Sequence, residues 1–145
     1  MPSGRARKRP EPQPPIFFFD RGVGRHLVPE VFRTAGYEVR IMVEVYPDGN
    51  DQNVTDPEWI ARASSEGWVA ITKDISILRH HEDALLASTL VVFALPNANL
   101  TGDQMAARFN THLNRIAQRS RHPGPVVWVV KADGLERRWP RPPTT

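Results

Sequence analysis

The chain has 145 residues and a mass of 16.4 kDa, which is the length of one typical domain and enough to bury a core without disulfides or a structural metal. It contains no cysteine, which excludes a disulfide framework, a thiolate zinc site and a cysteine nucleophile. Hydrophobic residues make up 40% and charged residues 24%, a composition that argues against wholesale disorder. No apolar run has the length of a membrane helix or of a signal-peptide core, so we expect a cytoplasmic protein that does not enter a membrane.

The formal net charge of +3 is unevenly distributed along the chain. Residues 1–15 and 137–145 each carry a surplus of three positive charges, whereas residues 16–136 hold 12 basic and 15 acidic residues. Basic, proline-rich ends are typical of solubilising tails and of segments that contact a polyanion. We expect a disordered basic arm over 1–15, a folded domain over 16–132 and a basic tail over 133–145.

Short apolar runs alternate with amphipathic segments along the body of the chain. The runs predict strands, and the amphipathic segments predict helices, one of which is opened by the capping box of Thr55 and Glu58. In chain order the predicted elements are strand 16–20, helix 27–35, strand 38–44, helix 55–67, strand 68–73, helix 75–87, strand 89–95, helix 101–121 and strand 125–131.

Nearly continuous apolar strands that alternate with helices predict a mostly parallel sheet of about five strands with helices on both faces. The fold class is therefore α/β, a three-layer α/β/α sandwich. In such folds ligands bind beyond the carboxyl ends of the strands, which directs attention to the residues that follow each strand.

Three aspartates are expected at this carboxyl edge. Asp20 closes the first strand and Asp74 follows the third. Asp56 opens the helix after the second strand and shares the inward face of Trp59 and Ile60. Each acid alone has a second interpretation, because Asp20 and Asp74 suit the caps of following helices and Asp56 suits the positive end of its own helix.

Together the three carboxylates favour a metal site. Two unit charges about 4 Å apart repel by roughly 4 kcal/mol at an effective dielectric constant near 20, and a divalent cation would neutralise that repulsion. Oxygen-only ligands favour Mg²⁺ or Mn²⁺. Such an ion can activate a water molecule for attack on a phosphodiester, so no protein nucleophile is needed.

The stretches FFFDRGVGRHLVPEVFRTAGYEV and TDPEWIARASSEGWVAITKD resemble the short PIN-like ribonucleases that are toxins of type II toxin–antitoxin pairs, the VapC-like group. The resemblance covers residues 16–95, and its most specific parts are the acid that closes the first strand, the Asp-x-Glu-Trp-Ile helix start and Gly-Trp-Val-x-Ile-Thr-Lys-Asp. It implies a PIN-like sandwich, Mg²⁺-dependent cleavage of RNA and inhibition by a cognate antitoxin, and relatives are often homodimers.

Position by position, Asp20, Asp56 and Asp74 match the family's catalytic, metal-binding acids. Larger relatives also have a fourth acid after the fourth strand, where residues 96–99 of this chain supply none. Glu82 is our candidate for this fourth ligand, and Asp51 is a weaker one.

Basic residues surround the expected acidic pocket. Arg21 and Arg25 follow Asp20, and Lys73 and Arg79 flank Asp74. We expect these four cations to bind the phosphates of a substrate that carboxylates alone would repel, although local charge balance is the alternative.

Other candidates are weaker. His80 and His81 would point about 100° apart on a helix and are interpreted as surface residues. Arg108, His112, Arg115 and Arg119 form a stripe on the last helix that suits either solvent or a nucleic-acid backbone. Trp59, Trp68 and Trp128 are expected in the core, and Trp139 is expected in the tail, where it is available to a partner.

Two other classes of function stay open at the level of sequence. A receiver-type phosphoacceptor module would explain Lys131 after the fifth strand, but it requires two adjacent acids after the first strand and a hydroxyl after the fourth, which are absent here. A PIN-like module that binds RNA or protein without cleavage is compatible with the missing fourth acid.

Overall fold

The structure is a computed structural model, and it describes residues 13–96 and 99–140. The expected arm over 1–15 therefore lies almost entirely outside the described residues. In these, the chain forms one sheet of six strands in the order β2-β1-β3-β4-β5-β6. All neighbouring strands are parallel except β5 and β6. The strands are β1 Ile16–Phe19, β2 Glu38–Ile41, β3 Val69–Thr72, β4 Val91–Ala94, β5 Val126–Lys131 and β6 Gly134–Trp139.

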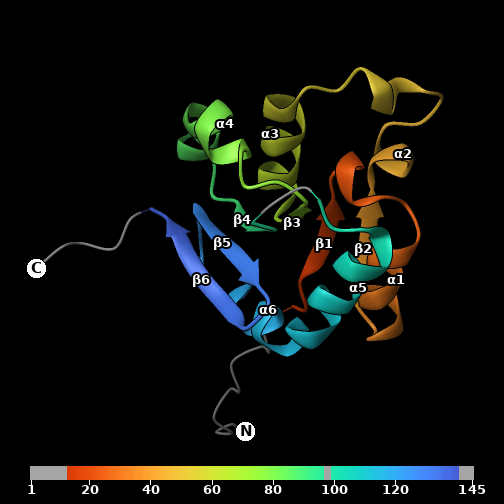
Figure 1. Ribbon diagram of the computed structural model, residues 1–145. Helices are drawn as coiled ribbons and strands as arrows, with labels where there is room; N and C mark the ends of the chain where they lie inside the picture. Colours follow the sequence, from red (N-terminus) through yellow and green to blue (C-terminus); the bar gives the residue numbers. More distant parts are fainter. Residues whose placement is uncertain (1–12, 97–98, 141–145) are drawn as a thin grey trace, which may run out of the picture.

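Helices cover both faces of this sheet. Figure 1 shows α3 and α4 together on one side and α1, α5 and α6 on the other. This arrangement confirms the expected three-layer α/β/α sandwich, with one strand more than expected. The helices are α1 Leu27–Thr34, α2 Met42–Val45, α3 Asp56–Glu66, α4 Ile77–Leu86, α5 Gly102–Thr111 and α6 Leu113–Arg119, and the short 3-10 turns are η1 Arg21–Val23 and η2 Asn50–Gln52.

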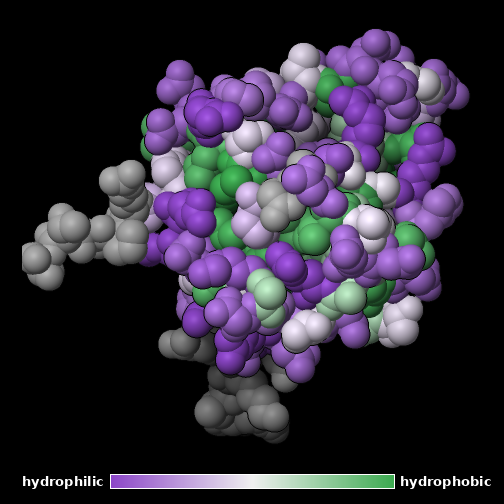
Figure 2. All heavy atoms as spheres, in the orientation of Figure 1, coloured by the Kyte–Doolittle hydropathy of each residue, from purple (hydrophilic) through white to green (hydrophobic). Residues whose placement is uncertain are grey.

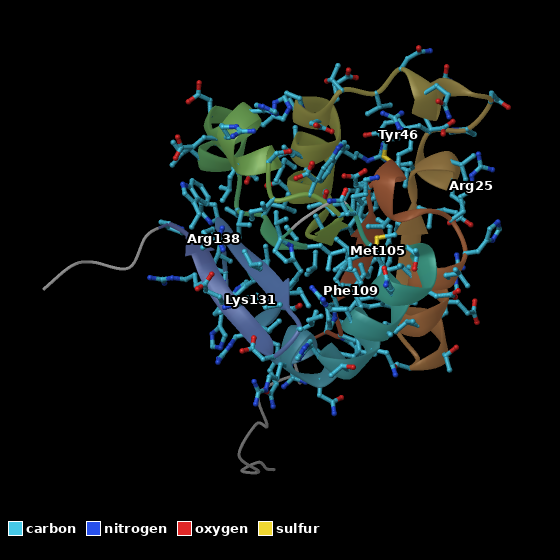
Figure 3. The ribbon with its side chains drawn as sticks, viewed as in Figure 1. Arg25, Tyr46, Met105, Phe109, Lys131 and Arg138 are labelled. Carbon is cyan, nitrogen blue, oxygen red and sulfur yellow. The ribbon has the colours of Figure 1, made fainter. Side chains whose placement is uncertain are left out.

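The alternation of side chains along β1 divides the core into two layers. Phe17 and Phe19 pack with α1 and α5, and Phe18 faces α3 and α4. On that second face the Phe18 ring stacks on the Trp68 ring with a centroid distance of 5.6 Å. From the other side, Met105 and Phe109 point from α5 toward the sheet (Figure 3) and are buried.

The polar surface is broken by apolar residues in places. Figure 2 shows hydrophilic residues over most of the face seen in Figure 1, with hydrophobic residues reaching the surface near the middle of the view. Within the described residues, no helix is long and apolar enough to span a membrane.

The second strand is shorter than expected. It ends at Ile41, and Met42 begins the single turn α2. Ile41 pairs with Phe19, the last residue of β1, so the residues beyond it have no partner strand to continue the ladder.

The long helix expected over 101–121 is broken into α5 and α6 at His112. The backbone of His112 has φ −108° and ψ 13°, and its buried imidazole lies with Nε2 3.1 Å from the carbonyl oxygen of Ala132. This contact across 20 residues of sequence holds the break, and it removes His112 from the solvent stripe expected on this helix.

The region expected as a basic tail from residue 133 forms β6 instead. Its backbone pairs antiparallel with β5, with an irregularity between Val127 and Trp128. Trp139 at its end is buried in the core beside α4 rather than free for a partner. The strand covers the edge of β5, which would otherwise expose unpaired backbone groups.

Close approach of the backbone fixes the start of β5. A Cβ atom on Gly124 would lie 2.3 Å from the carbonyl oxygen of Leu90, which shows that only glycine fits there. The amide of Val126 donates to the same carbonyl at 3.1 Å, so β5 is held against the residue before β4.

Candidate functional site

Asp20 lies at the carboxyl edge of the sheet, directly after β1. Its amide extends the ladder by donating to the Ile71 carbonyl at 3.0 Å. One carboxylate oxygen, Oδ1, accepts from the Gly22 amide at 2.7 Å, and the other, Oδ2, accepts from the Thr72 hydroxyl at 2.6 Å. Asp20 thus caps the turn η1, which is one of the two roles that the sequence suggested for it. The hydrogen bond from Thr72 also fixes its carboxylate to β3.

Burial raises the pKa of Asp20 above its ordinary value of 3.8. The hydrogen bonds from Thr72 and Gly22 lower it, and the negative charge of Asp56 raises it again. The raised pKa means that the ionised carboxylate is held at a cost in this environment. The contribution of Asp56 places that second acid within electrostatic reach of Asp20.

Asp56 is the first residue of α3, where the capping box of Thr55 and Glu58 fixes the helix start as expected. Its Oδ1 accepts from the Trp59 indole at 2.8 Å, and its Oδ2 lies 3.2 Å from Nε2 of His81 on α4. Both oxygens therefore have partners within the chain. His81 has a non-helical backbone conformation, φ −136° and ψ 32°, which interrupts α4 at this position.

Asp74 follows β3 by two residues and caps the turn that leads into α4. Its Oδ1 accepts from the Ser76 amide at 2.8 Å. Because Thr72 on the same strand end contacts Asp20, the segment that carries Asp74 leaves the sheet beside the first aspartate.

The structure tests how well these residues suit a divalent cation. Within residues 13–96 and 99–140, no three His, Asp or Glu side chains are grouped closely enough to hold a metal ion in the conformation described. The donor chemistry nevertheless fits, because all three side chains offer carboxylate oxygens, which Mg²⁺ and Mn²⁺ prefer. A cation would also offset the burial and the Asp56 charge that raise the pKa of Asp20.

Lys73 lies against the turn that follows Asp20. A Cβ atom on Gly22 would be 3.2 Å from Cγ, Cδ and Cε of Lys73, so the glycine leaves room for the lysine stem to cross η1. Lys73, one of the basic residues expected around the acids, therefore lies beside Asp20.

The arginines expected around the acids have different surroundings. Arg21 donates to the backbone carbonyl of Asp51 and links η1 to η2. Arg25 and Arg21 line a small hollow of about 50 Å³ together with Asp20 and the buried Asp51. Arg79 is exposed on α4.

Glu82 forms a hydrogen bond with the last strand, β6. Its Oε2 accepts from the indole Nε1 of Trp139 at 2.9 Å, a contact between α4 and the last strand. This bond favours a structural role for Glu82 over the fourth metal ligand for which it was the candidate.

Sequence reasoning did not identify three residues that contact the acids: Thr72, Trp59 and His81. Thr72 could have been found, because a hydroxyl at the end of an apolar strand, beside a strand that ends in Asp20, is a signal in itself. His81 was expected to be a surface residue, whereas the structure half-buries it against Asp56 at the interruption of α4.

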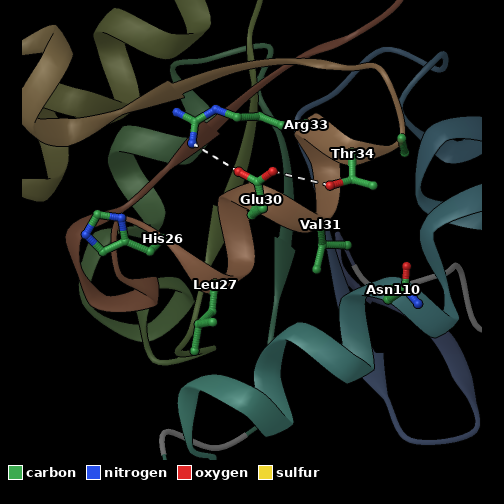
Figure 4. A pocket seen from close by; sticks show the side chains of 8 residues that line it. His26, Leu27, Glu30, Val31, Arg33, Thr34 and Asn110 are labelled. Carbon is green, nitrogen blue, oxygen red and sulfur yellow. Dashed lines mark hydrogen bonds and ion pairs between the residues drawn. The ribbon is translucent and has the colours of Figure 1, made fainter.

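A larger hollow lies elsewhere, between α1 and α5 (Figure 4). It has a volume of about 640 Å³ and includes the exposed Leu27. Its one carboxylate, Glu30, pairs with Arg33 and accepts a hydrogen bond from Thr34. A single carboxylate that is already paired does not suit metal-dependent chemistry.

Comparisons with known proteins agree with the fold. The family model described as "PIN like domain" matches residues 15–97. A curated protein of Mycobacterium tuberculosis named "Putative ribonuclease VapC45" is 34% identical over 122 residues, which cover 83% of this chain and 88% of that protein. No solved structure gives a significant match. Asp20, Asp56 and Asp74 all lie inside the matched region.

Proposed function

This chain belongs to the PIN-like domain family, in the VapC-like group, and from that membership we propose that it is an endoribonuclease toxin that hydrolyses RNA phosphodiesters. The observation that carries the proposal is the half-buried Asp20 carboxylate at the carboxyl edge of the sheet, held by the Thr72 hydroxyl and the Gly22 amide and within electrostatic reach of Asp56.

We further propose that Asp20, Asp56 and Asp74 are the catalytic acids and hold one Mg²⁺ or Mn²⁺ ion. When bound, such an ion activates water and stabilises the charge that develops on the phosphodiester. Thr72 and the Gly22 amide fix the orientation of Asp20. To hold such an ion, Oδ2 of Asp56 would have to give up its contact with His81, while the Trp59 indole would keep Oδ1 in place.

Basic side chains at the same edge orient the RNA. Lys73 crosses the turn after Asp20, and Arg25 lines the hollow next to that carboxylate. In this proposal they bind the phosphates on either side of the scissile bond, with Arg79 contacting a more distant phosphate. The main role of Arg21 in this proposal is to hold the loop at Asp51, and its contact with RNA contributes less to binding.

A partner protein is part of the proposal. A ribonuclease toxin needs an inhibitor in the cell that makes it, and we propose a cognate antitoxin in that role. Co-expression with the product of an adjacent small reading frame should yield a complex that lacks ribonuclease activity, and size-exclusion chromatography with light scattering of the toxin alone should report whether it is a homodimer.

The proposal is tested by incubating the purified protein with mixed RNAs in Mg²⁺ or in EDTA. Cleavage is expected in Mg²⁺ only, and Asp20→Asn should reduce the rate by at least about 100-fold, since loss of one charge-stabilising group at a catalytic centre typically costs about 10²–10³. Asp133→Asn, in the turn between β5 and β6 and three strands along the sheet from β1, removes the same charge from a residue outside the proposed acids and should cleave like the wild type.

One observation favours a second candidate, a PIN-like module that binds RNA without cleaving it. Both oxygens of Asp56 are already occupied by Trp59 and His81. The same assay separates the two: RNA binding with no metal-dependent cleavage by the wild type would establish the second candidate and overturn the first.

A further inference from the structure

A second basic surface lies at the opposite end of the sheet from the catalytic acids. Two adjoining hollows, of about 550 Å³ and 290 Å³, share His122 and Pro123 as lining residues. They are formed by segments that precede strands: Gly67 and Trp68 before β3, Thr89 before β4, and residues 123–125 before β5. Asp20 and Asp74, by contrast, follow their strands. We call the two hollows together the amino-edge surface.

Positive charge is concentrated on this surface. Arg119, His122 and Arg137 line the larger hollow, and Arg121 lines the smaller one. All four side chains are exposed, and within the described part of the chain none of them forms an ion pair. Neither hollow is lined by a carboxylate from those residues, so the surface attracts anions.

Two tryptophans of the amino-edge surface each have a guanidinium group over the ring. The Cζ atom of Arg119 lies 5.3 Å from the Trp128 ring centre, and that of Arg62 lies 5.6 Å from the Trp68 ring centre. Trp128 is half-buried and pairs across the hairpin with Arg137. The larger hollow thus has a flat wall in which the Arg119 guanidinium lies over the Trp128 ring, with Arg137 on the neighbouring strand.

This chemistry matches single-stranded nucleic acid. A nucleotide combines a flat, weakly polar base with a phosphate, and bases stack on aromatic rings and on guanidinium planes. A hollow of 550 Å³ is in the usual size range, about 300–1000 Å³, of sites for small ligands. An acidic peptide would satisfy the charges but would not use the flat wall.

We propose that the amino-edge surface is a second RNA-binding site, one that rests on the proposed ribonuclease function and holds substrate RNA away from the scissile phosphate. Phosphates contact Arg119, Arg121 and Arg137, and a base stacks on the Arg119 guanidinium over Trp128. The surface contributes to binding of RNAs long enough to reach both ends of the sheet and does not take part in the chemical step.

The test uses full-length protein with Asp20→Asn, in EDTA, so that binding is measured without cleavage. The probe is a fluorescent single-stranded RNA of about 30 nucleotides, beyond the ~4–16 nucleotides of a typical single site. Arg119→Gln with Arg137→Gln should weaken binding at least tenfold. The slope of log affinity against log salt should become less steep by about 1.4, because each phosphate contact on a single strand contributes about 0.7.

Matched controls distinguish the loss of this binding site from a general loss of positive charge. Arg33→Gln with Arg108→Gln removes an exposed arginine from α1 and a half-buried arginine from α5 and should change the affinity less than threefold. Arg119→Lys keeps the charge without the planar group, and should preserve the salt slope while weakening binding. Unchanged affinity in the Arg119/Arg137 variant overturns the proposal, and so does competition by polyglutamate as strong as that by RNA, which would indicate an acidic protein partner.

The outcome does not depend on catalysis. If the proposed function is wrong, wild-type protein fails to cleave RNA in Mg²⁺. If the inference is wrong, the Arg119/Arg137 variant binds RNA like its parent. In an active enzyme the same variant should raise KM for the long RNA and leave kcat unchanged.

Discussion

At the scale of single residues, the structure combines opposing effects at Asp20. Burial and the charge of Asp56 raise its pKa, whereas the Thr72 hydroxyl and the Gly22 amide stabilise the ionised form. Opposing effects on one pKa are typical of functional carboxylates. A fully solvated carboxylate would gain less from binding a cation, because its charge is already stabilised by water. The ionised Asp20 carboxylate that the proposed chemistry requires therefore lowers the stability of the folded protein.

A stability measurement tests this effect. The folded protein binds the Asp20 proton more tightly than the unfolded chain does, so the contribution of this group is present below pH 3.8 and is lost as pH rises through the raised pKa. Asp20→Asn removes the cost of ionisation. In EDTA the variant should have a higher Tm than wild type at neutral pH, and the difference should shrink toward pH 3.8.

Asp133→Asn is the control and should leave the Tm nearly unchanged at every pH. Addition of Mg²⁺ should raise the Tm of wild type more than that of Asp20→Asn, because only the folded wild type binds the ion fully. An Asp20→Asn protein that is less stable than wild type at neutral pH in EDTA would refute the assignment of Asp20 as a destabilising, ligand-ready carboxylate.

At the scale of elements, local sequence patterns explain some parts of the fold better than others. The parallel strands β1, β3, β4 and β5 were predictable because they are buried on both faces and are therefore almost continuously apolar. The strand β6 was not, because its GLERRW sequence is mostly exposed and charged, as suits an edge strand. The break at His112 depends on a contact with Ala132, which no local pattern encodes.

The contact between Trp139 and Glu82 connects β6 to α4 and can be measured with a double-mutant cycle. Trp139→Phe removes the indole donor and keeps most of the buried ring, and Glu82→Ala removes the acceptor. Urea unfolding of the single and double variants should give a coupling free energy of about 0.5–1.5 kcal/mol.

The same variants decide between the two roles of Glu82. A structural role predicts that Glu82→Ala cleaves RNA and binds Mn²⁺ like wild type. A loss of Mn²⁺ affinity of tenfold or more, with no coupling to Trp139, would instead make Glu82 the fourth ligand that the sequence suggested.

At the scale of the whole molecule, the two ends of the sheet differ in charge: acids and bases are mixed at the carboxyl edge, whereas no carboxylate of the described residues lines the amino-edge surface. The positions of Asp20 and Asp74 after their strands and of Asp56 at the start of a helix were predictable from the chain order of strands and helices. Their actual contacts were not, because the partners of Asp56 depend on side-chain directions and on the interruption of α4 at His81. The basic amino-edge surface could not be predicted from the sequence either, because residues far apart in sequence, such as Arg119 and Arg137, come together only in the fold.

The central claim is that Asp20, Asp56 and Asp74 converge on one divalent cation. A crystal soaked in Mn²⁺ and measured near the manganese absorption edge tests it most directly. The account predicts an anomalous peak in contact with all three carboxylates, with the Asp56 side chain turned away from His81. A map with no such peak, or with manganese bound only at other residues, would contradict it.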